Sequence, residues 1–496
     1  MKGSKAPKTY LIEVSPLKKT PLQEGLSYFG SEKLIPGQIV RVNIRNQNVP
    51  GVVLSCTDAR EEKTNLRKAR FALRKINKGD IQEVALSETL LKATKETAKY
   101  YVSSERAILE NILPKIIIQE PGKFLEKAKT KKIEKETNPE PLLLQMESIE
   151  RYAQYRRLIR ESFARGASVL LICPTHLDVE KIKPELSFGI EEFVWSLTLK
   201  DKPSEAKKNW HKAKAEKHPI LFITTPAGLA FEREDLDTLI LERENSRAYR
   251  SIGPISIDWR FFIRKLAKEK KVEFISGDSI LSLKTLLEYK KGLYSEESLI
   301  RWRLPLSSTK LVDTSIKADN EKRFNLFSPE LKEMIESSLQ NKGSIFLFGA
   351  RKGLHPSTTC ADCGTVLPCL NCGAPLVLHH KDETPFYLCH SCSLRQDSQT
   401  LCPNCNSWRL VPLGIGTEEI AREVKELYPE TPVWILDKEY APTESKAKKI
   451  VSEFKEEGGV LVGTELSFFY LNSLSHSAVV SLDSLFSIPD FSINER

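Results

Sequence analysis

The sequence contains no long apolar segment. Within its 496 residues, no uncharged apolar run reaches the roughly 18 residues that a membrane-spanning helix needs. The N-terminal stretch MKGSKAPKTYLIEV also lacks the apolar core of a secretory signal peptide. These absences exclude a helical membrane span and a signal peptide of the usual kind, so we expect a cytoplasmic protein.

A large excess of charge of one sign is also missing. The formal net charge is +9, from 75 basic and 66 acidic residues. This modest excess is compatible with a polyanionic partner but does not point to one. Hydrophobic residues make up 40% of the chain and charged residues 28%, a balance typical of globular proteins. The length predicts about two to four domains.

Cysteine is scarce outside one stretch of the chain. Of ten cysteines, Cys56 and Cys173 lie alone in apolar segments, where we expect core residues. The other eight form four Cys-x-x-Cys pairs. In a reducing cytoplasm such pairs favour metal binding over disulfides, because each pair presents two thiolates to one tetrahedral zinc ion. Four pairs predict two structural Zn2+ ions, and four thiolates on each ion leave no open position for hydrolysis.

The spacing of the pairs indicates how they share the two ions. Five residues separate the first pair from the second, a tight loop for converging on one ion, whereas sixteen separate the second from the third, a common zinc-site spacing. This favours a nested arrangement, although a crossed one also fits the spacing. The nested ligand sets are Cys360, Cys363, Cys402 and Cys405 for one zinc, and Cys369, Cys372, Cys389 and Cys392 for the other. We expect the nearby His379, His380 and His390 to be spectators.

The remaining chain has a β-rich start followed by a long alternating region. Short β-branched segments run from residue 8 to about 56, and helical patterns follow them. Further along, apolar β-rich segments such as ASVLLICP and LDTLILE alternate with amphipathic stretches, which predicts parallel sheets covered on both faces. The cysteine stretch interrupts this alternation between GSIFLFGA and TPVWILD. We therefore predict an α/β protein with two lobes and a metal-binding insert in the second.

The cysteine stretch and its surroundings resemble the PriA family of primosomal replication-restart DNA helicases. The most specific part runs from TTCADCG, through the four cysteine pairs and a GTE sequence, to TPVWILD. The segments LFSPELKEMIESSLQNKGSIFLF and TPAGLAFEREDLDTLILE extend the resemblance, as does the N-terminal PLQEGLSYFGSEKLIPGQIVRVNIRNQNVPGVVL. The resemblance implies a small DNA 3′-end-binding domain followed by two RecA-like superfamily 2 helicase lobes.

The resemblance also implies domain limits. We expect the DNA 3′-end-binding domain and its following helices at 1–112, and a charged linker at 113–141 where the family has a winged helix. The first lobe is expected at 142–300 and the second at 301–496, with the double-zinc insert at about 356–408. We expect the second lobe to be incomplete, because the sequence ends before the position of the family's arginine-rich final motif.

The family's phosphate loop is missing at the corresponding position. Such a loop needs glycines, whose backbone N–H groups surround the phosphates, followed by a Lys and a small hydroxyl residue. In this sequence, side chains stand at the three glycine positions, an arginine replaces the lysine, and a tyrosine replaces the hydroxyl residue. These residues are Gln145, Ser148, Glu150, Arg151 and Tyr152. We therefore expect that ATP and Mg2+ are not bound.

Other ATPase motifs are altered as well. The acidic D-E-E-H box falls on Glu242-Arg243-Glu244-Asn245, where Glu242 is the one residue expected to retain a cation ligand. The G-S-A-T-P motif falls on Ser276-Gly277-Asp278-Ser279-Ile280, and Gly463-Thr464 is kept without the glycine-containing A-K-G-H that follows it in the family. The alternative is an active ATP-dependent 3′-to-5′ helicase with a cryptic or partner-completed site. A decayed or truncated gene and a zinc-containing RNA-processing factor are further alternatives.

Two basic segments are candidate DNA contacts. The first lies around a predicted strand and turn, and the second surrounds Phe71, where basic residues beside an aromatic ring suit phosphate neutralisation with base stacking. The residues are Arg41, Arg45, Asn46, Gln47, Arg67, Lys68, Arg70, Arg74 and Lys75. An ordinary solvated turn explains the first segment equally well, and a solvated helix face is the commoner explanation for the second. By resemblance, the expected partners are forked DNA, single-stranded-DNA-binding protein and other primosome proteins.

Overall fold

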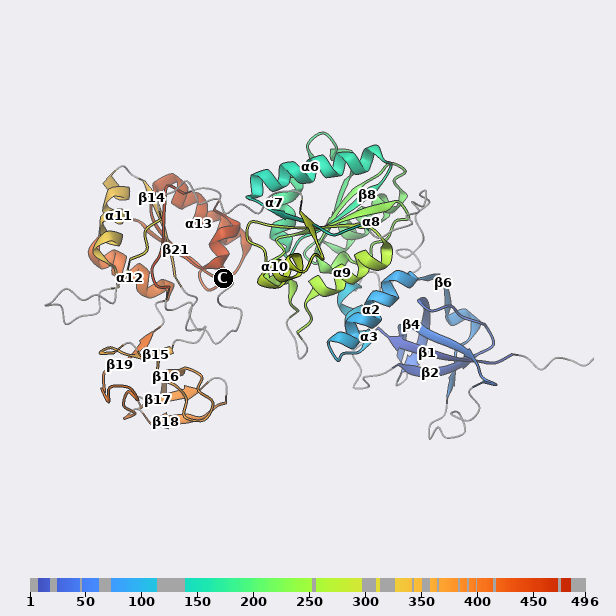
Figure 1. Cartoon of the computed structure of the whole chain (residues 1–496), viewed down its shortest axis with the longest axis horizontal. Helices are drawn as coiled ribbons and strands as arrows, with labels where there is room; N and C mark the ends of the chain where they lie inside the picture. Colours follow the sequence, from blue (N-terminus) through green and yellow to red (C-terminus); the bar gives the residue numbers. More distant parts are fainter. Residues whose placement is uncertain are drawn as a thin grey trace, which may run out of the picture. The chain divides into compact units, whose positions relative to one another are not determined.

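The chain folds into two compact units, Met1–Trp302 and Arg303–Arg496 (Figure 1). The computed structural model describes residues 8–17, 25–44, 47–61, 73–113, 139–251, 256–296, 309–312, 326–340, 343–349, 357–363, 365–381, 384–389, 392–397, 399–413, 416–471 and 474–482. Most of the predicted charged linker at 113–141 lies outside these residues. Within the described part of the chain, no helix is both long and apolar enough to cross a membrane.

The first unit begins with a six-stranded sheet in the order β5-β2-β1-β4-β3-β6. Its strands are β1 (Tyr10–Pro16), β2 (Leu26–Gly30), β3 (Gln38–Ile44), β4 (Gln47–Asp58), β5 (Arg74–Lys75) and β6 (Ile81–Ala85). In β3, Val40 and Val42 are buried while Arg41 between them is exposed, the alternation of a half-buried strand. The prediction of a β-rich start is confirmed.

Two helices connect this sheet to the rest of the unit. They are α2 (Glu88–Tyr100) and α3 (Glu105–Ile112), and each begins at a serine whose hydroxyl accepts a backbone N–H of the first turn. A single apolar cluster includes Ile39 of β3, Leu90 of α2 and Ile108 of α3, and it extends to residues of the following lobe. One face of the N-terminal sheet thus shares an apolar core with the first lobe, while residues such as Val14 and Val40 form a separate cluster within the sheet.

The first lobe is built on a seven-stranded parallel sheet in the order β13-β7-β12-β11-β8-β10-β9. Its strands are β7 (Leu142–Gln145), β8 (Ser168–Ile172), β9 (Val194–Leu197), β10 (Leu221–Thr224), β11 (Leu236–Glu242), β12 (Glu273–Asp278) and β13 (Ser295–Glu296). In β11, Leu239 and Leu241 join one apolar cluster and Ile240 joins another. Because successive side chains enter opposite cores, the strands are apolar along their whole length.

Helices cover both faces of this sheet (Figure 1). On one face, α6 (Ser148–Ala164) and α7 (His176–Ser187) contribute to the apolar cluster that contains Ile240. On the other, α8 (Pro203–Ala215), α9 (Trp259–Lys270) and α10 (Leu283–Lys290) pack on the cluster that contains Leu239. The predicted parallel sheet with two covered faces is confirmed.

The second unit repeats this architecture on a smaller scale. Its parallel sheet has the order β20-β21-β14-β22. The strands are β14 (Ser344–Phe348), β20 (Val433–Leu436), β21 (Gly459–Gly463) and β22 (His476–Val479). One apolar cluster contains residues of α11 (Pro329–Gln340) and α12 (Thr417–Leu427), and a second contains those of α13 (Glu444–Glu457).

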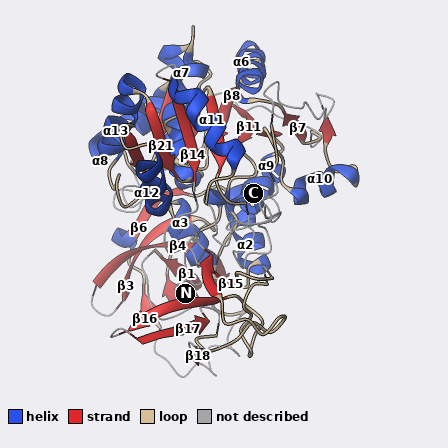
Figure 2. Ribbon diagram, turned by 90° about the vertical axis from the view of Figure 1, so that its left-hand side faces the viewer, coloured by secondary structure: helices blue, strands red, loops and turns tan. Residues whose placement is uncertain are grey.

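The insert lies between β14 and α12 and forms its own antiparallel strands. It contains β15 (Ser357–Cys360), β16 (Leu376–Lys381), β17 (Thr384–Cys389), β18 (Arg395–Asp397) and β19 (Leu410–Leu413). Strands β16, β17 and β18 form one sheet (Figure 2), and β15 pairs separately with β19. The predicted insert in the second lobe is confirmed.

Candidate functional site

The eight paired cysteines form two groups in the insert. One group is Cys360, Cys363, Cys402 and Cys405, and the other is Cys369, Cys372, Cys389 and Cys392. In each group the four Sγ atoms lie within 4.8 Å of one another. The structure thus brings together the nested sets that the spacing favours, and not the crossed ones.

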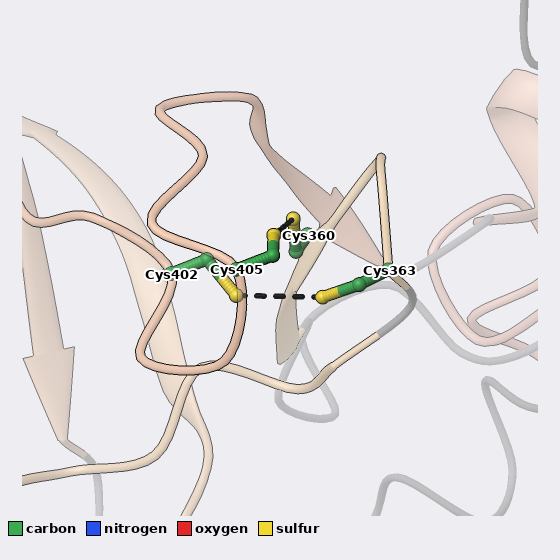
Figure 3. A group of neighbouring side chains, drawn as sticks. All are labelled: Cys360, Cys363, Cys402 and Cys405. Atoms are coloured by element: carbon green, nitrogen blue, oxygen red, sulfur yellow. Dashed lines mark hydrogen bonds between the residues drawn. The ribbon is translucent and has the colours of Figure 1, made fainter.

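The distances within each group suit a tetrahedral metal ion. In the first group, Sγ of Cys360 is 3.5 Å from Sγ of Cys405, and the Sγ atoms of Cys363 and Cys402 are equally far apart (Figure 3). The corresponding separations in the second group are 3.5 and 3.4 Å. All eight thiols are free, and a disulfide would need about 2.05 Å. Ligands about 2.3 Å from a tetrahedral zinc ion lie roughly 3.8 Å from one another, so both groups could hold such an ion.

A recurring backbone turn orients the thiols. In three of the pairs, the residue after the second cysteine donates its N–H to the carbonyl of the first cysteine, and this residue has a positive φ of 72°, 61° or 53°. The three residues are Gly373, Ser393 and Asn406. Glycine and asparagine tolerate this left-handed conformation best. The turn reverses the chain within each pair, so both sulfur atoms point to the same side.

A side-chain contact holds the outer pairs together. Asp362, between the first two cysteines, accepts a hydrogen bond from Nη1 of Arg409 at 2.9 Å and another from the hydroxyl of Ser407. Both partners follow the fourth cysteine pair in the sequence. Contacts of this kind orient metal ligands that come from distant parts of a chain.

Three neighbouring strands of the first lobe end where ATPase motifs are expected. Strand β7 ends at Gln145, β12 at Asp278 and β11 at Glu242, and β12 lies between the other two. The carboxyl ends of parallel strands share one edge of the sheet, where α/β proteins usually bind ligands. We call this region the carboxyl edge.

Arg151 and Glu242 form a buried ion pair at the carboxyl edge. Nε of Arg151 lies 2.9 Å from Oε2 of Glu242, and Nη2 lies 2.7 Å from Oε1. The side chains are 3% and 1% exposed. Tyr155, one helical turn further along α6, donates its hydroxyl to Oε2 at 2.9 Å. Both oxygens of Glu242 are therefore bonded by donors of the chain itself.

Burial and hydrogen bonding set the charges at this edge. Burial by itself lowers the pKa of Arg151, but the hydrogen-bonded Glu242 carboxylate outweighs it and raises the pKa above the ordinary value. Burial raises the pKa of Asp278 to about 6, although backbone N–H groups of Asn245 and Ser279 favour its ionised form. Arg151 thus stays charged at neutral pH, and the charge of Asp278 responds to mild acid.

The backbone needed for a phosphate loop is absent between β7 and α6. Strand β7 ends at Gln145 and α6 begins at Ser148, so Met146 and Glu147 alone connect them. Glu150, Arg151 and Tyr152 are already helical. A phosphate loop requires a longer non-helical segment whose N–H groups point inward. In this fully described segment, the chain lacks that backbone conformation as well as the usual side chains.

The remaining positions of the acidic box have structural partners. Arg243, with a φ of 52°, donates to Asp178 of α7 at 2.7 Å. Glu244 is 1% exposed and accepts hydrogen bonds from the backbone and hydroxyl of Ser282, at the start of α10. With Asn245 bound to Asp278 through its backbone, each of these residues contacts a neighbouring element.

The predicted DNA contacts lie partly within the described residues. Arg41 of β3, Gln47 of β4, and Arg74 and Lys75 of β5 are exposed. Nη1 of Arg74 lies 2.5 Å from Oδ1 of Asn43 in β3, so the sheet curves enough to bring these non-adjacent strands together. Arg45, Asn46, Arg67, Lys68 and Arg70 lie outside the described residues.

Sequence reasoning missed Tyr155 and the role of Asp278. Tyr155 follows Arg151 by four residues on a helix, so their shared face was readable from the spacing. In the structure, Gly277 makes room for this side chain, because an added Cβ there would lie 1.9 Å from the Tyr155 hydroxyl. The burial of Asp278 had no such signal, because it depends on which strands flank β12.

Comparison with known protein families identifies the N-terminal region. Residues 18–114 match the family model of the PriA 3′ DNA-binding domain, described as 3′DNA-binding domain (3′BD). This range covers most of the first sheet together with α2 and α3.

Curated relatives match most of the chain. The replication restart protein PriA of Haemophilus influenzae is 26% identical over 354 residues, covering 69% of this chain and 47% of the relative. That of Thermotoga maritima is 27% identical, covering 67% and 45%. That of Rickettsia conorii is 23% identical over 486 residues, covering 93% and 72%. The chain spans about half the length of the first two relatives.

Proposed function

We propose that this chain, which belongs to the PriA family of replication restart proteins, binds branched or forked DNA and acts as a scaffold without hydrolysing ATP. The observation that supports this most is the Arg151–Glu242 ion pair at the carboxyl edge. The cationic group that would neutralise phosphate is committed to the carboxylate that would hold Mg2+.

Electrostatics oppose a nucleotide at the carboxyl edge. Separating a buried ion pair leaves an uncompensated charge, which costs about 3–5 kcal/mol. A bound nucleotide would have to offset that cost in addition to its own desolvation. Glu147 and Glu150 also place carboxylates at the beginning of α6, where a triphosphate would lie. Repulsion therefore adds to the missing phosphate loop.

DNA binding is assigned to the N-terminal sheet. Its match to a 3′ DNA-binding domain and the exposed Arg41, Arg74 and Lys75 support contact with the phosphate backbone. Neutralising phosphates releases bound counterions, so the affinity is expected to fall steeply with salt and to show little base preference. From the family we infer forked DNA, single-stranded-DNA-binding protein and other primosome proteins as partners, and the cytoplasm as the location.

The insert is assigned a structural role. We propose Zn2+ in both cysteine groups, because four thiolates at tetrahedral distances suit zinc and leave no coordination position for a substrate. Held in this way, the insert would offer a fixed surface to a partner protein or a DNA strand.

Nucleotide calorimetry on the full chain tests the ATPase proposal. We expect no heat of binding with MgATP, with or without fork DNA, and no DNA-stimulated hydrolysis above background. Stimulated hydrolysis that falls in the variant Glu242→Gln would instead establish an active helicase with a cryptic site. The Gln variant is chosen because it removes the carboxylate charge while keeping the size of the side chain and one acceptor oxygen for Arg151 and Tyr155.

A gel-shift titration tests DNA recognition separately. Fork DNA and blunt duplex of equal length are compared at several salt concentrations. We expect tighter binding to the fork and a steep loss of affinity with salt for both. Equal affinity for the two DNAs would contradict fork recognition.

A further inference from the structure

Aromatic rings reach the surface of the first unit where α2 packs against α9. The ring of Tyr100 is stacked on that of Phe261, with centroids 4.2 Å apart and planes inclined by 19°. Tyr101 meets both rings edge-on, at 5.0 and 5.9 Å. Tyr100 nevertheless remains 59% exposed. One face of its ring is covered by Phe261, and much of the ring is left to solvent.

Val102 extends this exposed apolar surface. It follows the end of α2 with a φ of 49° and is 90% exposed. Helices usually place glycine or asparagine in this left-handed position, because a β-branched side chain is strained there. Val102 therefore combines backbone strain with exposure of an apolar side chain, and it gains little burial in return.

Lysines flank the rings. Nζ of Lys265 lies 5.5 Å from the centroid of Phe261 and 2.6 Å from a carboxylate oxygen of Glu96. Lys99 is exposed beside Tyr100, and Lys268 is exposed one turn further along α9. Cations around an open aromatic face form the combination that binds single-stranded nucleic acid, because every base has a face that can stack.

The position of these rings relative to the N-terminal sheet is set by packing. Helix α2 lies inside the region that matches the 3′ DNA-binding domain. Its first turn is tied to the lobe through Ser87, which donates to Glu232, and Nζ of Lys270 binds the same carboxylate at 2.8 Å. The shared apolar core of α2 and α9 completes this attachment.

We infer that Tyr100, supported by Phe261, is a stacking platform for a base of single-stranded DNA, with the exposed Lys99 beside the strand's phosphates. This inference rests on the proposed DNA-binding function and adds a single-strand contact to it. An apolar partner peptide is disfavoured, because the lysines around the rings match a polyanion better than an apolar surface.

Fluorescence anisotropy with the full chain tests the platform. One probe is a labelled blunt duplex, and the other is the same duplex with a single-stranded oligothymidine tail. We expect Tyr100→Ala to weaken binding of the tailed DNA by roughly 5- to 100-fold, as for the loss of one stacked base, and to leave the blunt duplex unaffected. Tyr100→Phe should bind both DNAs like the original chain.

Two further variants separate stacking from folding. Phe188 is 75% exposed in the same unit and outside the platform, so Phe188→Ala should change neither affinity. Lys99→Glu should weaken binding of the tailed DNA alone. With 2-aminopurine in the tail, the original chain should quench its fluorescence by stacking, and Tyr100→Ala should remove that quenching.

Three outcomes would overturn the proposal in different ways. Unchanged binding of tailed DNA by Tyr100→Ala, with the quenching intact, excludes the platform and leaves DNA binding standing. An equal loss on both probes shows that Tyr100 acts through the fold. If the original chain binds neither probe, the proposed DNA-binding function fails, and the platform fails with it.

Discussion

The carboxyl edge of the first lobe and the insert of the second unit satisfy their polar groups in opposite ways. At the carboxyl edge, Arg151 and Tyr155 supply donors to both oxygens of Glu242, so the site is complete without a ligand. In the insert, two groups of four thiols converge on one another. The carboxylate at the carboxyl edge is thus satisfied by donors of the chain itself, whereas the thiols of the insert are arranged so that each group could hold an ion.

The size of the surrounding core accounts for part of this difference. Two large apolar clusters cover the seven-stranded sheet, so the lobe holds its shape without a ligand. The insert has a small cluster around Leu367, Leu376 and Tyr387, which also includes cysteine side chains. Small domains with so little core usually depend on metals or disulfides for stability.

Removing the metal should unfold the insert and leave the first lobe folded. Structural zinc sites contribute about 10–16 kcal/mol of apparent binding free energy to folding, and a chelator removes this contribution. We expect a chelator to make the insert sensitive to protease while the thermal transition of the first unit stays in place. We also expect purified protein to carry one metal ion for each of its two cysteine groups, as measured by plasma mass spectrometry.

Single substitutions sharpen this test. The Cys389→Ser variant should bind one metal ion instead of two. The Cys56→Ser variant should still bind two, because Cys56 lies outside both cysteine groups. A metal-free insert that resists protease would show that the cysteine groups do not depend on an ion.

Removing the Arg151–Glu242 ion pair should destabilise the first lobe and leave the metal content of the insert unchanged. Arg151→Ala leaves Glu242 buried without its partner, at a cost of about 3–5 kcal/mol. For a unit of about 300 residues, that corresponds to a fall in melting temperature of roughly 5–8 °C. Calorimetric unfolding measures the fall, and metal content should not change.

The matched control is an exposed ion pair on the same helix. Arg157 contacts Glu161 at 3.0 Å with both side chains nearly half exposed, so Arg157→Ala should cost less than about 1 kcal/mol. The double variant Arg151→Met with Glu242→Gln should recover much of the lost stability, since it removes both charges of the pair together. Equal melting temperatures for Arg151→Ala and Arg157→Ala would refute the importance of the buried pair.

The smallest expected effect concerns the pH response of the carboxyl edge. The pKa of Asp278 is raised to about 6 in the folded chain, above the roughly 3.9 of an unfolded one. The folded state therefore binds more protons between these values, and the lobe gains stability, up to about 2–3 kcal/mol, as the pH falls from about 6 to 4. Asp278→Asn should remove this gain in melting curves recorded across that range. Parallel pH profiles for the variant and the original chain would contradict the shifted pKa.

Local patterns allowed much of the fold to be predicted. The apolar runs that became β8, β10 and β11 were readable because both faces of a covered parallel sheet are apolar. Strands β7 and β9 were not identified, although they are as long as β10, which has four residues. Their pairing with longer neighbours, rather than their own composition, makes them strands.

The cysteine groups and the Arg151–Glu242 pair also differ in how far they could be predicted from local sequence patterns. Spacing favoured the nested cysteine groups, since a loop between two pairs must be long enough to close on one ion, but it left the crossed arrangement open until the structure brought the nested sets together. The Arg151–Glu242 pair joins residues 91 positions apart, and no local pattern connects them. Substitution of the ATPase motifs was visible in the sequence, but the reuse of Arg151 as a partner for Glu242 was not.

Two features of this protein can be read from the amino-acid sequence alone. Eight of its cysteines form Cys-x-x-Cys pairs, and the first lobe lacks the glycines of a phosphate loop. These are properties of neighbouring residues, and bond geometry carries them directly into local structure. Only the tertiary structure decided that β12 lies between β7 and β11, that Glu242 is closed off by Arg151, and that Tyr100 is stacked on Phe261 at the surface. Such contacts arise when distant segments bury their apolar faces together, and chain order alone does not specify which segments will meet.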